Sequence, residues 1–346
     1  AAAQEADGYL YTTRTFCPEA PHAWAGTQRW ELETDLSHEL YNLGHLFDAA
    51  VAHHEATGKR SLLEVAMRAA DLLARTFGPG KRSIWPGHQI TEMALVRLAR
   101  ATGDGRYVEL ARFLLDERGP DGKPRSNDIY NQSHACVAEQ SEAVGHAVRA
   151  TYMYAGMADV AAFGGGETYV AALERIWSDI VAHKLYITGG IGAYAAGEAF
   201  GPADELPNRT AYNETCAAIG LVYFSHRMFL LHGQAGAIDV LERTLYNGLL
   251  AGVSLDGKAF FYPNPLESHA DYARSPWFGC ACCPGNVARF LASVPGYGYA
   301  HSAGTVYVNL YASGSAQVAL EGGGRLELRQ HTDYPWDGDI RLRIEA

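Results

Sequence analysis

The sequence predicts a mainly α-helical protein: an (α/α)6 toroid, or barrel, of paired helices around a central cleft, followed by the start of a β-sandwich domain. Three observations predict this class. From Leu36 to about Gly298, apolar residues recur at three- and four-residue steps, which is the period of an amphipathic helix. Glycine-rich or polar turns separate these segments into pairs. After Pro295, apolar and polar residues alternate, which is typical of strands.

The helices are expected in the following order. The first contains Leu36, Leu40, Leu43, Phe47 and Val51, and Gly58 closes it in EATGKR. The next cover residues 62–78, about 86–103, 107–119, 136–156, 167–183, 216–232 and 235–250. At the N-terminus, AAAQEADGYLY is similar to the end of a helix.

The strands are expected in TVYVNLYASGSAQVAL (305–320), GRLELRQHTDYPW (324–336) and DIRLRIEA (339–346). So few strands leave unpaired edges, which further strands would have to cover. We therefore divide the chain into a helical catalytic domain, residues 1–300, and the beginning of a β-sandwich domain, residues 301–346.

Composition narrows the classes of function. The net charge of -11 and the lack of a basic cluster exclude nucleic acid and anionic membranes as partners. No apolar run reaches the roughly 18 residues of a membrane helix, and the N-terminus lacks the features of a secretory signal. A disulfide framework would spread its cysteines over a smaller secreted chain, so the six cysteines are expected as reduced thiols. Reduced thiols favour a cytoplasmic location.

Two short motifs hold the residue types of a metal site. NETC contains Glu214 and Cys216, and CACC contains Cys280, Cys282 and Cys283. Zinc favours four-coordinate sites of thiolate, imidazole and carboxylate groups, often drawn from separate segments. The spacing matches no zinc finger or ribbon. A catalytic metal, a structural zinc that joins two loops, and buried free cysteines all stay open on this pattern.

A glycine-rich loop, YITGGIGAYAAGEAFGPADELPN (186–208), contains one candidate acid. It is no phosphate-binding loop, because GxxxxGK[ST] and a preceding strand are both lacking. Glu198 lies there beside Ala199 and Phe200. Apolar neighbours favour the neutral form of a carboxyl, which suits a general acid, so we expect a raised pKa. The alternative is a solvated loop glutamate.

Histidines beside glycine form a third group: His45 in GHLF, His88 in PGHQ and His146 in VGHAVRA. Each is also explained as a core histidine with a satisfied hydrogen bond. His38 and His45 are seven residues apart and share a helix face with Tyr41, a polar stripe that would line the cleft of a toroid. Tyr262, in FFYPNPLE, either projects into the same space or packs.

In combination these motifs resemble a known family. GGIGAYAAGEAF, NETC sixteen residues after its glutamate, FFYPNPLE and W-x-G-C-x-C-C-P are similar to those of the bacterial β-L-arabinofuranosidases of glycoside hydrolase family 127. HELYNLGHLFDAAVAHHEATGKRSLL and PGHQITEMALVRLARATGD add to the resemblance, which covers most of residues 1–300. Family members are longer at both ends, so we expect a catalytic portion that lacks the first helices. Gly285 in CCPGN replaces a proline of the family's CCPPN.

The resemblance implies a retaining glycoside hydrolase that releases β-linked L-arabinofuranose from plant-type glycans. It implies that Zn2+ is held by Glu214, Cys216, Cys282 and Cys283. Cys282 would also be the nucleophile, and Glu198 the general acid and base. The sugar would contact His45, His88, His146 and Tyr262, with His38 as the rival of His45. Cys280 would be a neighbour of the site.

Two other functions account for part of the pattern. A sugar epimerase or isomerase on the same toroid would use paired histidines to move protons, and it would leave the cysteines without a role. A zinc-stapled carbohydrate-binding protein would use the cysteines without turnover. In every case the expected partner is a small sugar or an oligosaccharide; the sequence leaves open whether the protein is a homo-oligomer.

Overall fold

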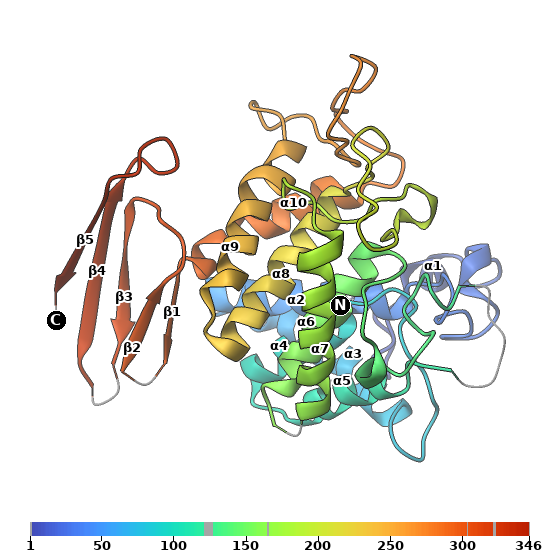
Figure 1. Cartoon of the computed structure of the whole chain (residues 1–346). Coiled ribbons are helices and arrows are strands. Elements are labelled where there is room, and N and C mark those ends of the chain that lie inside the picture. The colour runs from blue at the N-terminus through green and yellow to red at the C-terminus, as the bar shows by residue number, and fades with distance from the viewer. Residues whose placement is uncertain (1, 121–126, 165, 303, 321–322, 346) are drawn as a thin grey trace.

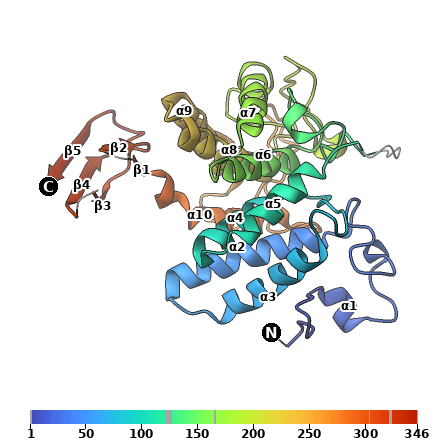
Figure 2. The same cartoon turned by 90° about the horizontal axis from the view of Figure 1, so that it is seen from below.

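The computed structural model describes residues 2–120, 127–164, 166–302, 304–320 and 323–345, and most of them belong to paired helices (Figure 1). The pairs are α2 (Glu39–Thr57) with α3 (Ser61–Thr76), α4 (Thr91–Thr102) with α5 (Arg106–Asp116), α6 (Ala147–Ala161) with α7 (Glu167–Asp179), and α8 (Thr215–His232) with α9 (Ala235–Arg243). The first helices of successive pairs pack on one another, α2 on α4, α4 on α6 and α6 on α8, and α10 (Cys282–Leu291) packs on α8 (Figure 2). The predicted α/α toroid class is confirmed, and the described residues supply these four pairs and α10.

Two of the inner helices, α6 and α8, differ from the outer helices in composition. Nearly every residue of α6 is buried, as are those of α8 from Thr215 to Ser225, whereas α3, α5 and α7 bury one face only. A helix that is apolar on all sides is stable only when other elements surround it. Small residues allow the inner helices to approach closely. A Cβ at Gly220 of α8 would lie 2.1 Å from Oγ1 of Thr151 in α6.

Three helical expectations need correction. Residues 136–146 are not an α-helix: they contain a short 3-10 turn, Val137–Glu139, and α6 begins at Ala147. Gly145 has a φ of 69°, and His146 is extended and caps α6, so the helix cannot extend further back. The helix expected from about residue 86 begins at Thr91, and residues 2–11 form turns before the short helix α1 (Thr12–Phe16). The other expected helices are confirmed, except that α2 begins at Glu39 and leaves Leu36 in the preceding turn. The π turns at Ile180–Lys184 and Thr244–Leu249 prolong α7 and α9.

Two small antiparallel sheets follow the helices (Figure 1). β1 (Tyr299–Ser302) pairs with β2 (Thr305–Val308), and β3 (Gly314–Ala319), β4 (Arg325–Thr332) and β5 (Ile340–Glu345) form a sheet in that order. The expected strand region is confirmed, although the run 305–320 is divided between β2 and β3. The ring of Tyr307 in β2 packs on Phe229 of α8, which joins the first sheet to the helices. Among the described helices, none combines the length and the apolar character needed to cross a membrane.

Gly220 gives a direct test of the close contact between α6 and α8. We expect Gly220→Ala to lower the free energy of unfolding by about 1–3 kcal/mol, because the added methyl must displace Thr151 in a packed core. Gly236→Ala in α9 is the matched control, because a Cβ there meets no atom within 4 Å. It should be neutral or stabilising by about 0.5–1 kcal/mol. Urea unfolding of both variants measures the difference; equal effects would contradict the packing argument.

Candidate active site

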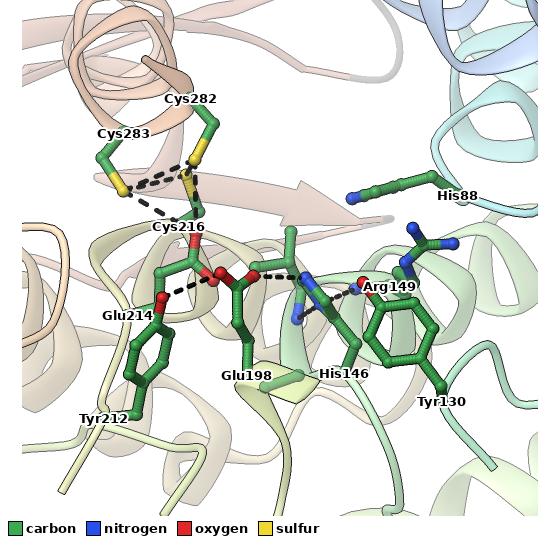
Figure 3. A network of polar contacts seen from close by, with 12 residues as sticks. His88, Tyr130, His146, Arg149, Glu198, Tyr212, Glu214, Cys216, Cys282 and Cys283 are labelled. Carbon is green, nitrogen blue, oxygen red and sulfur yellow. Dashed lines mark hydrogen bonds and ion pairs between the residues drawn. The ribbon is translucent and has the colours of Figure 1, made fainter. Parts of the chain in front are cut away.

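The N-termini of two helices meet at the centre of the site (Figure 3). Glu214 is the N-cap residue of α8, and Cys216 lies in its first turn, while Cys282 and Cys283 are the first two residues of α10. The Sγ atom of Cys216 lies 3.5 Å from those of both Cys282 and Cys283, which are 3.7 Å apart. Oε1 of Glu214 lies 3.4 Å and 3.7 Å from the same two sulfur atoms. The structure therefore brings together all four residues for which the resemblance implied a metal.

The four donor atoms have the spacing of a metal site. All of them lie within 4.8 Å of one another. A tetrahedral metal with metal–sulfur bonds of about 2.3 Å would hold its sulfur ligands roughly 3.8 Å apart, close to the observed separations. Oε2 of Glu214 is buried without a hydrogen-bond partner. An unpaired buried carboxylate oxygen is costly, so the residues fit a cation that would satisfy it.

The cluster concentrates negative charge on one sulfur. Hydrogen bonds from Cys216 and Cys283 lower the pKa of Cys282 far below the usual range of a thiol. The hydrogen bond with Cys282 in turn raises the pKa of Cys216, and burial raises that of Glu214. Cys282 is also the accessible member, because it is half-buried whereas Cys216, Cys283 and Glu214 are buried. Cys280 is exposed and lies outside this cluster of donors.

Glu198 lies on the other side of Glu214 from the sulfur atoms (Figure 3). Its Oε1 accepts a hydrogen bond of 2.8 Å from the hydroxyl of Tyr212, and its Oε2 lies 2.7 Å from Nε2 of His146. Burial raises the pKa of Glu198, but the contacts with His146 and Tyr212 outweigh it, and the net pKa lies below the usual value. The expected raised pKa is therefore wrong for this state, because the carboxylate has two polar partners that the sequence does not reveal.

The histidines extend this site on the side of α2 and α6. The ring centroid of His88 lies 5.6 Å from that of His146, 5.8 Å from that of His38 and 4.2 Å from that of Tyr41. Burial lowers the pKa of His88 and His146, so both rings are neutral. His45 also contacts Tyr41, and the centroids of their rings lie 4.5 Å apart.

His45 has different surroundings from the other histidines. Burial lowers its pKa to about 4, and Arg289 and Asp48 are the charged groups around it. His38 instead lies near Arg149 and His146, so it faces the same region as His88. The sequence could not separate the two, because a seven-residue spacing puts both on one helix face. His38 is in fact the left-handed residue before α2, with a φ of 58°.

Tyr262 lies beside the sulfur atoms. Its backbone carbonyl accepts a hydrogen bond of 3.0 Å from the N–H of Thr215, which ties its segment to the start of α8. Burial, with the charges of Glu214 and Cys282, raises the pKa of its phenol. The hydroxyl therefore stays protonated and can donate. The structure thus gathers His88, His146 and Tyr262 with the cysteines.

Sequence reasoning missed several side chains of this site. They are Tyr130, Arg149 and Tyr212. Tyr41, which the sequence grouped with His38 and His45, also lies here. Tyr212 stands directly before the motif NETC, and Arg149 lies three residues after His146 within VGHAVRA. No periodicity marks Tyr130 or Tyr212, because both lie in irregular backbone, whereas Arg149 lies in α6.

A polar network ties α10 to the inner helices. Arg289 donates to the hydroxyl of Tyr152 in α6 at 2.9 Å and to Asp48 of α2 at 3.3 Å. Asn286 donates to the same hydroxyl at 2.8 Å. Because Asn286 lies one helical turn after Cys282, these bonds fix the rotation of α10 and so the direction of its two cysteines.

The loop that carries His88 is held from two sides. Arg149 donates to the carbonyl oxygen of Gly87, whose N–H donates to the carbonyl oxygen of Glu33 at 2.9 Å. A Cβ at Gly87 would lie 2.5 Å from that carbonyl oxygen, so the approach requires glycine. The carboxyl of Glu33 is buried in turn, and its Oε2 accepts hydrogen bonds of 2.8 Å from Ser37 Oγ and from the N–H of Glu39.

The fold and the site together define a class: a helical toroid protein with a buried cysteine and glutamate cluster at its centre. Comparison with known proteins identifies the family. Residues 1–296 match the family model described as the GH127 catalytic domain of beta-L-arabinofuranosidase, and residues 305–346 match that of its middle domain. The chain therefore belongs to glycoside hydrolase family 127, and the resemblance seen in the motifs is confirmed.

Comparison with individual relatives supports the assignment to this family. The chain is 37% identical over 377 residues to a non-reducing end beta-L-arabinofuranosidase of Bifidobacterium longum subsp. longum, with 99% of this chain and 56% of the relative covered. A solved GH127 beta-arabinofuranosidase superposes with a TM-score of 0.94 at 59% identity, covering 99% of this chain and 54% of the other. A GH127 beta-L-arabinofuranosidase of Geobacillus stearothermophilus T6 gives 0.90 at 40% identity, with 99% and 57% covered. The chain spans about half the length of these relatives.

The buried carboxyl of Glu33 predicts that the stability of the protein depends on pH. Burial raises its pKa from 4.5 to about 8, so the folded protein keeps a proton that the unfolded chain releases. Stability should therefore fall as pH rises from about 4.5 to 8. Glu33→Gln imitates the protonated form, so it should reduce the loss between pH 5 and 8 by on the order of 2–4 kcal/mol. Urea unfolding across this range measures it. Glu64→Gln, on the exposed face of α3, is the control, and an unchanged pH slope in Glu33→Gln would contradict the assignment.

Proposed function

We propose that this protein is a retaining glycoside hydrolase that releases β-linked L-arabinofuranose from plant-type glycans. Membership of family 127 and the β-L-arabinofuranosidase activity for which its relatives are named support this reaction. The observation that carries the mechanism is the position of Cys282, the half-buried thiol of an otherwise buried cluster, with the Glu198 carboxylate nearby. We propose further that residues 1–300 form the catalytic domain and residues 301–346 the start of a β-sandwich domain.

We propose zinc as the metal, held by Glu214, Cys216, Cys282 and Cys283. A set of three thiols and one carboxylate is soft, which favours zinc over magnesium or calcium. Bound there, zinc would keep its thiol ligands ionised at neutral pH. The chain itself contributes the low pKa of Cys282 and the two helix N-termini, whose positive ends favour thiolates.

In the first step, the sulfur of Cys282 forms a bond to the anomeric carbon of the sugar. The bond from that carbon to the glycosidic oxygen breaks, and its electron pair goes to the leaving oxygen. Glu198 gives its proton to this oxygen, which leaves as an alcohol. A bound sugar excludes water, which strengthens the effects of burial and of the charge of Cys282, and both raise the pKa of Glu198.

In the second step, water replaces the sulfur on the same carbon. Glu198, now a carboxylate, takes a proton from the water as its oxygen bonds to the anomeric carbon. The carbon–sulfur bond breaks, and Cys282 leaves with the electron pair as a thiolate. Two displacements at one carbon retain its configuration.

We propose that His88, His146 and Tyr262 contact the sugar. Nδ1 of His88 lies 2.9 Å from the carbonyl oxygen of Gln89 and donates to it, so Nε2 is left as an acceptor for a sugar hydroxyl. Between the rival histidines, the surroundings favour His38 over His45, because His38 lies beside His88 and near Arg149 and His146. Contact of His45 with the sugar stays a prediction of the sequence.

The zinc proposal predicts about one zinc ion per chain by elemental analysis. Chelation should lower the melting temperature by roughly 5–15 °C, because a ligand that binds only the folded state stabilises it. Cys283→Ser should lose stoichiometric metal, since it removes a buried sulfur of the cluster. Cys136→Ser, at an exposed cysteine away from the site, is the matched control and should keep it. Fully active protein without metal would refute the proposal.

The nucleophile proposal predicts that Cys282→Ser loses at least about 10³-fold in kcat on nitrophenyl β-L-arabinofuranoside, or about 4 kcal/mol of barrier. Cys280→Ser, two residues earlier and exposed, should keep most of the activity. NMR of the first-formed product of the wild type should show the β-anomer. An active Cys282→Ser variant would favour the epimerase alternative if the sugar is isomerised, and would in any case exclude this mechanism.

A further inference from the structure

Both oxygens of the Glu198 carboxylate have a polar partner on the chain. Tyr212 donates its hydroxyl proton to Oε1 at 2.8 Å, and Nε2 of His146 lies 2.7 Å from Oε2 (Figure 3). The phenol of Tyr212 is a donor here, because a carboxylate without a proton can only accept. Whether the imidazole also donates depends on which of its nitrogens carries the proton.

Helix α6 answers this question. His146 is the N-cap residue of α6, and its Nδ1 accepts hydrogen bonds from the N–H groups of Val148 at 3.2 Å and Arg149 at 3.3 Å. A nitrogen that accepts from backbone N–H groups carries no proton. In the neutral ring the proton is therefore on Nε2, which points at Glu198. The first turn of the helix thus makes His146 a hydrogen-bond donor.

The backbone around Glu198 is held by the same elements. Glu198 has a φ of 51°, in the left-handed region that a glutamate seldom occupies. The next residue, Ala199, forms antiparallel bridges to both Tyr194 and His146, and the N–H of Phe200 donates to the carbonyl of Gly145 at 2.9 Å. The main chain of Glu198 is therefore fixed against the residue that contacts its side chain. Strain of this kind persists where the surroundings determine it.

We propose that Tyr212 and His146 are positioning residues that hold the Glu198 carboxylate in one orientation through two donated hydrogen bonds. The N-terminus of α6 selects the tautomer of His146 that makes this possible. This inference rests on the proposed role of Glu198 as acid and base. Each carboxylate oxygen keeps one further lone pair, so the proton that Glu198 gives or takes uses a position that neither partner occupies. Tyr212 and His146 keep their own protons in both steps.

Tyr212→Phe tests the first hydrogen bond and leaves the ring in place beside Tyr262. Its kcat/KM should fall about 10–100-fold on alkyl arabinofuranosides, whose leaving groups need a proton, but less than about 3-fold on nitrophenyl arabinofuranosides. Glu198→Gln should show the same pattern with larger losses. Tyr194→Phe is the matched control, because Tyr194 is in the same loop and donates to Glu205 instead. It should change neither rate.

His146→Asn tests the second hydrogen bond without removing the cap. Asparagine is among the best N-cap residues, but its side chain is too short to replace Nε2 at Glu198. We expect the same dependence on the leaving group as in Tyr212→Phe, with a melting temperature close to that of the wild type. His146→Ala removes the cap as well, and should cost about 1 kcal/mol of stability in addition.

The tautomer has a readout that needs no substrate. In protein with 15N-labelled histidine, the signal that disappears in His146→Asn should show a protonated Nε2 and an unprotonated Nδ1. A protonated Nδ1 would overturn the inference. So would equal losses on both substrate classes in Tyr212→Phe, which would indicate a structural role alone. If the activity of Glu198→Gln shows no dependence on the leaving group, the proposed role of Glu198 as the general acid is refuted, and the positioning inference is refuted with it. If Glu198→Gln shows the dependence and Tyr212→Phe does not, only the positioning inference falls.

Discussion

The close approach of two helix N-termini is the constraint on which the site depends. Glu214 and Cys216 lie at the start of α8, and Cys282 and Cys283 at the start of α10. One donor atom from each of these four side chains lies within 4.8 Å of the others. Such a group is stable in a protein interior only when its charges are paired or a cation joins them. The buried, unpartnered Oε2 of Glu214 is the clearest sign of this demand. The rest of the fold serves to keep the two helix ends at this distance.

Several features of the helical core meet that requirement. Gly220 lets α8 lie against α6, and the hydroxyl of Tyr152 in α6 receives hydrogen bonds from both Asn286 and Arg289 of α10. Contacts with one inner helix, α6, thus fix both the start of α8 and the direction of α10. The N-terminus of that same helix also holds His146, which contacts Glu198. One buried helix therefore positions the cysteine and glutamate cluster and the candidate acid and base together.

Electrostatics separates the two sides of the site. The sulfur side concentrates charge on Cys282, because the neighbouring thiols donate to it. On the carboxylate side, His146 and Tyr212 lower the pKa of Glu198 while the charge of Cys282 raises it. The two groups of the proposed reaction are therefore coupled through their charges, and the proton on Glu198 depends on the ionisation of Cys282. Pairs of titratable groups with opposed environments are typical of acid and base chemistry.

The sequence by itself determined the helical pairs, the change to strands after Pro295, and the residue types of the site. It could do so because helical period, strand alternation and metal-donor chemistry are local properties of the chain. Tertiary structure alone decided the start of α6 at Ala147, the contact of His38 with His88, and the partners of Glu198. These depend on irregular backbone and on contacts between segments far apart in the chain. The sequence neighbours of Glu198, an alanine and a phenylalanine, suggest apolar surroundings for its carboxyl. Only the fold brings Tyr212 and His146 to its oxygens.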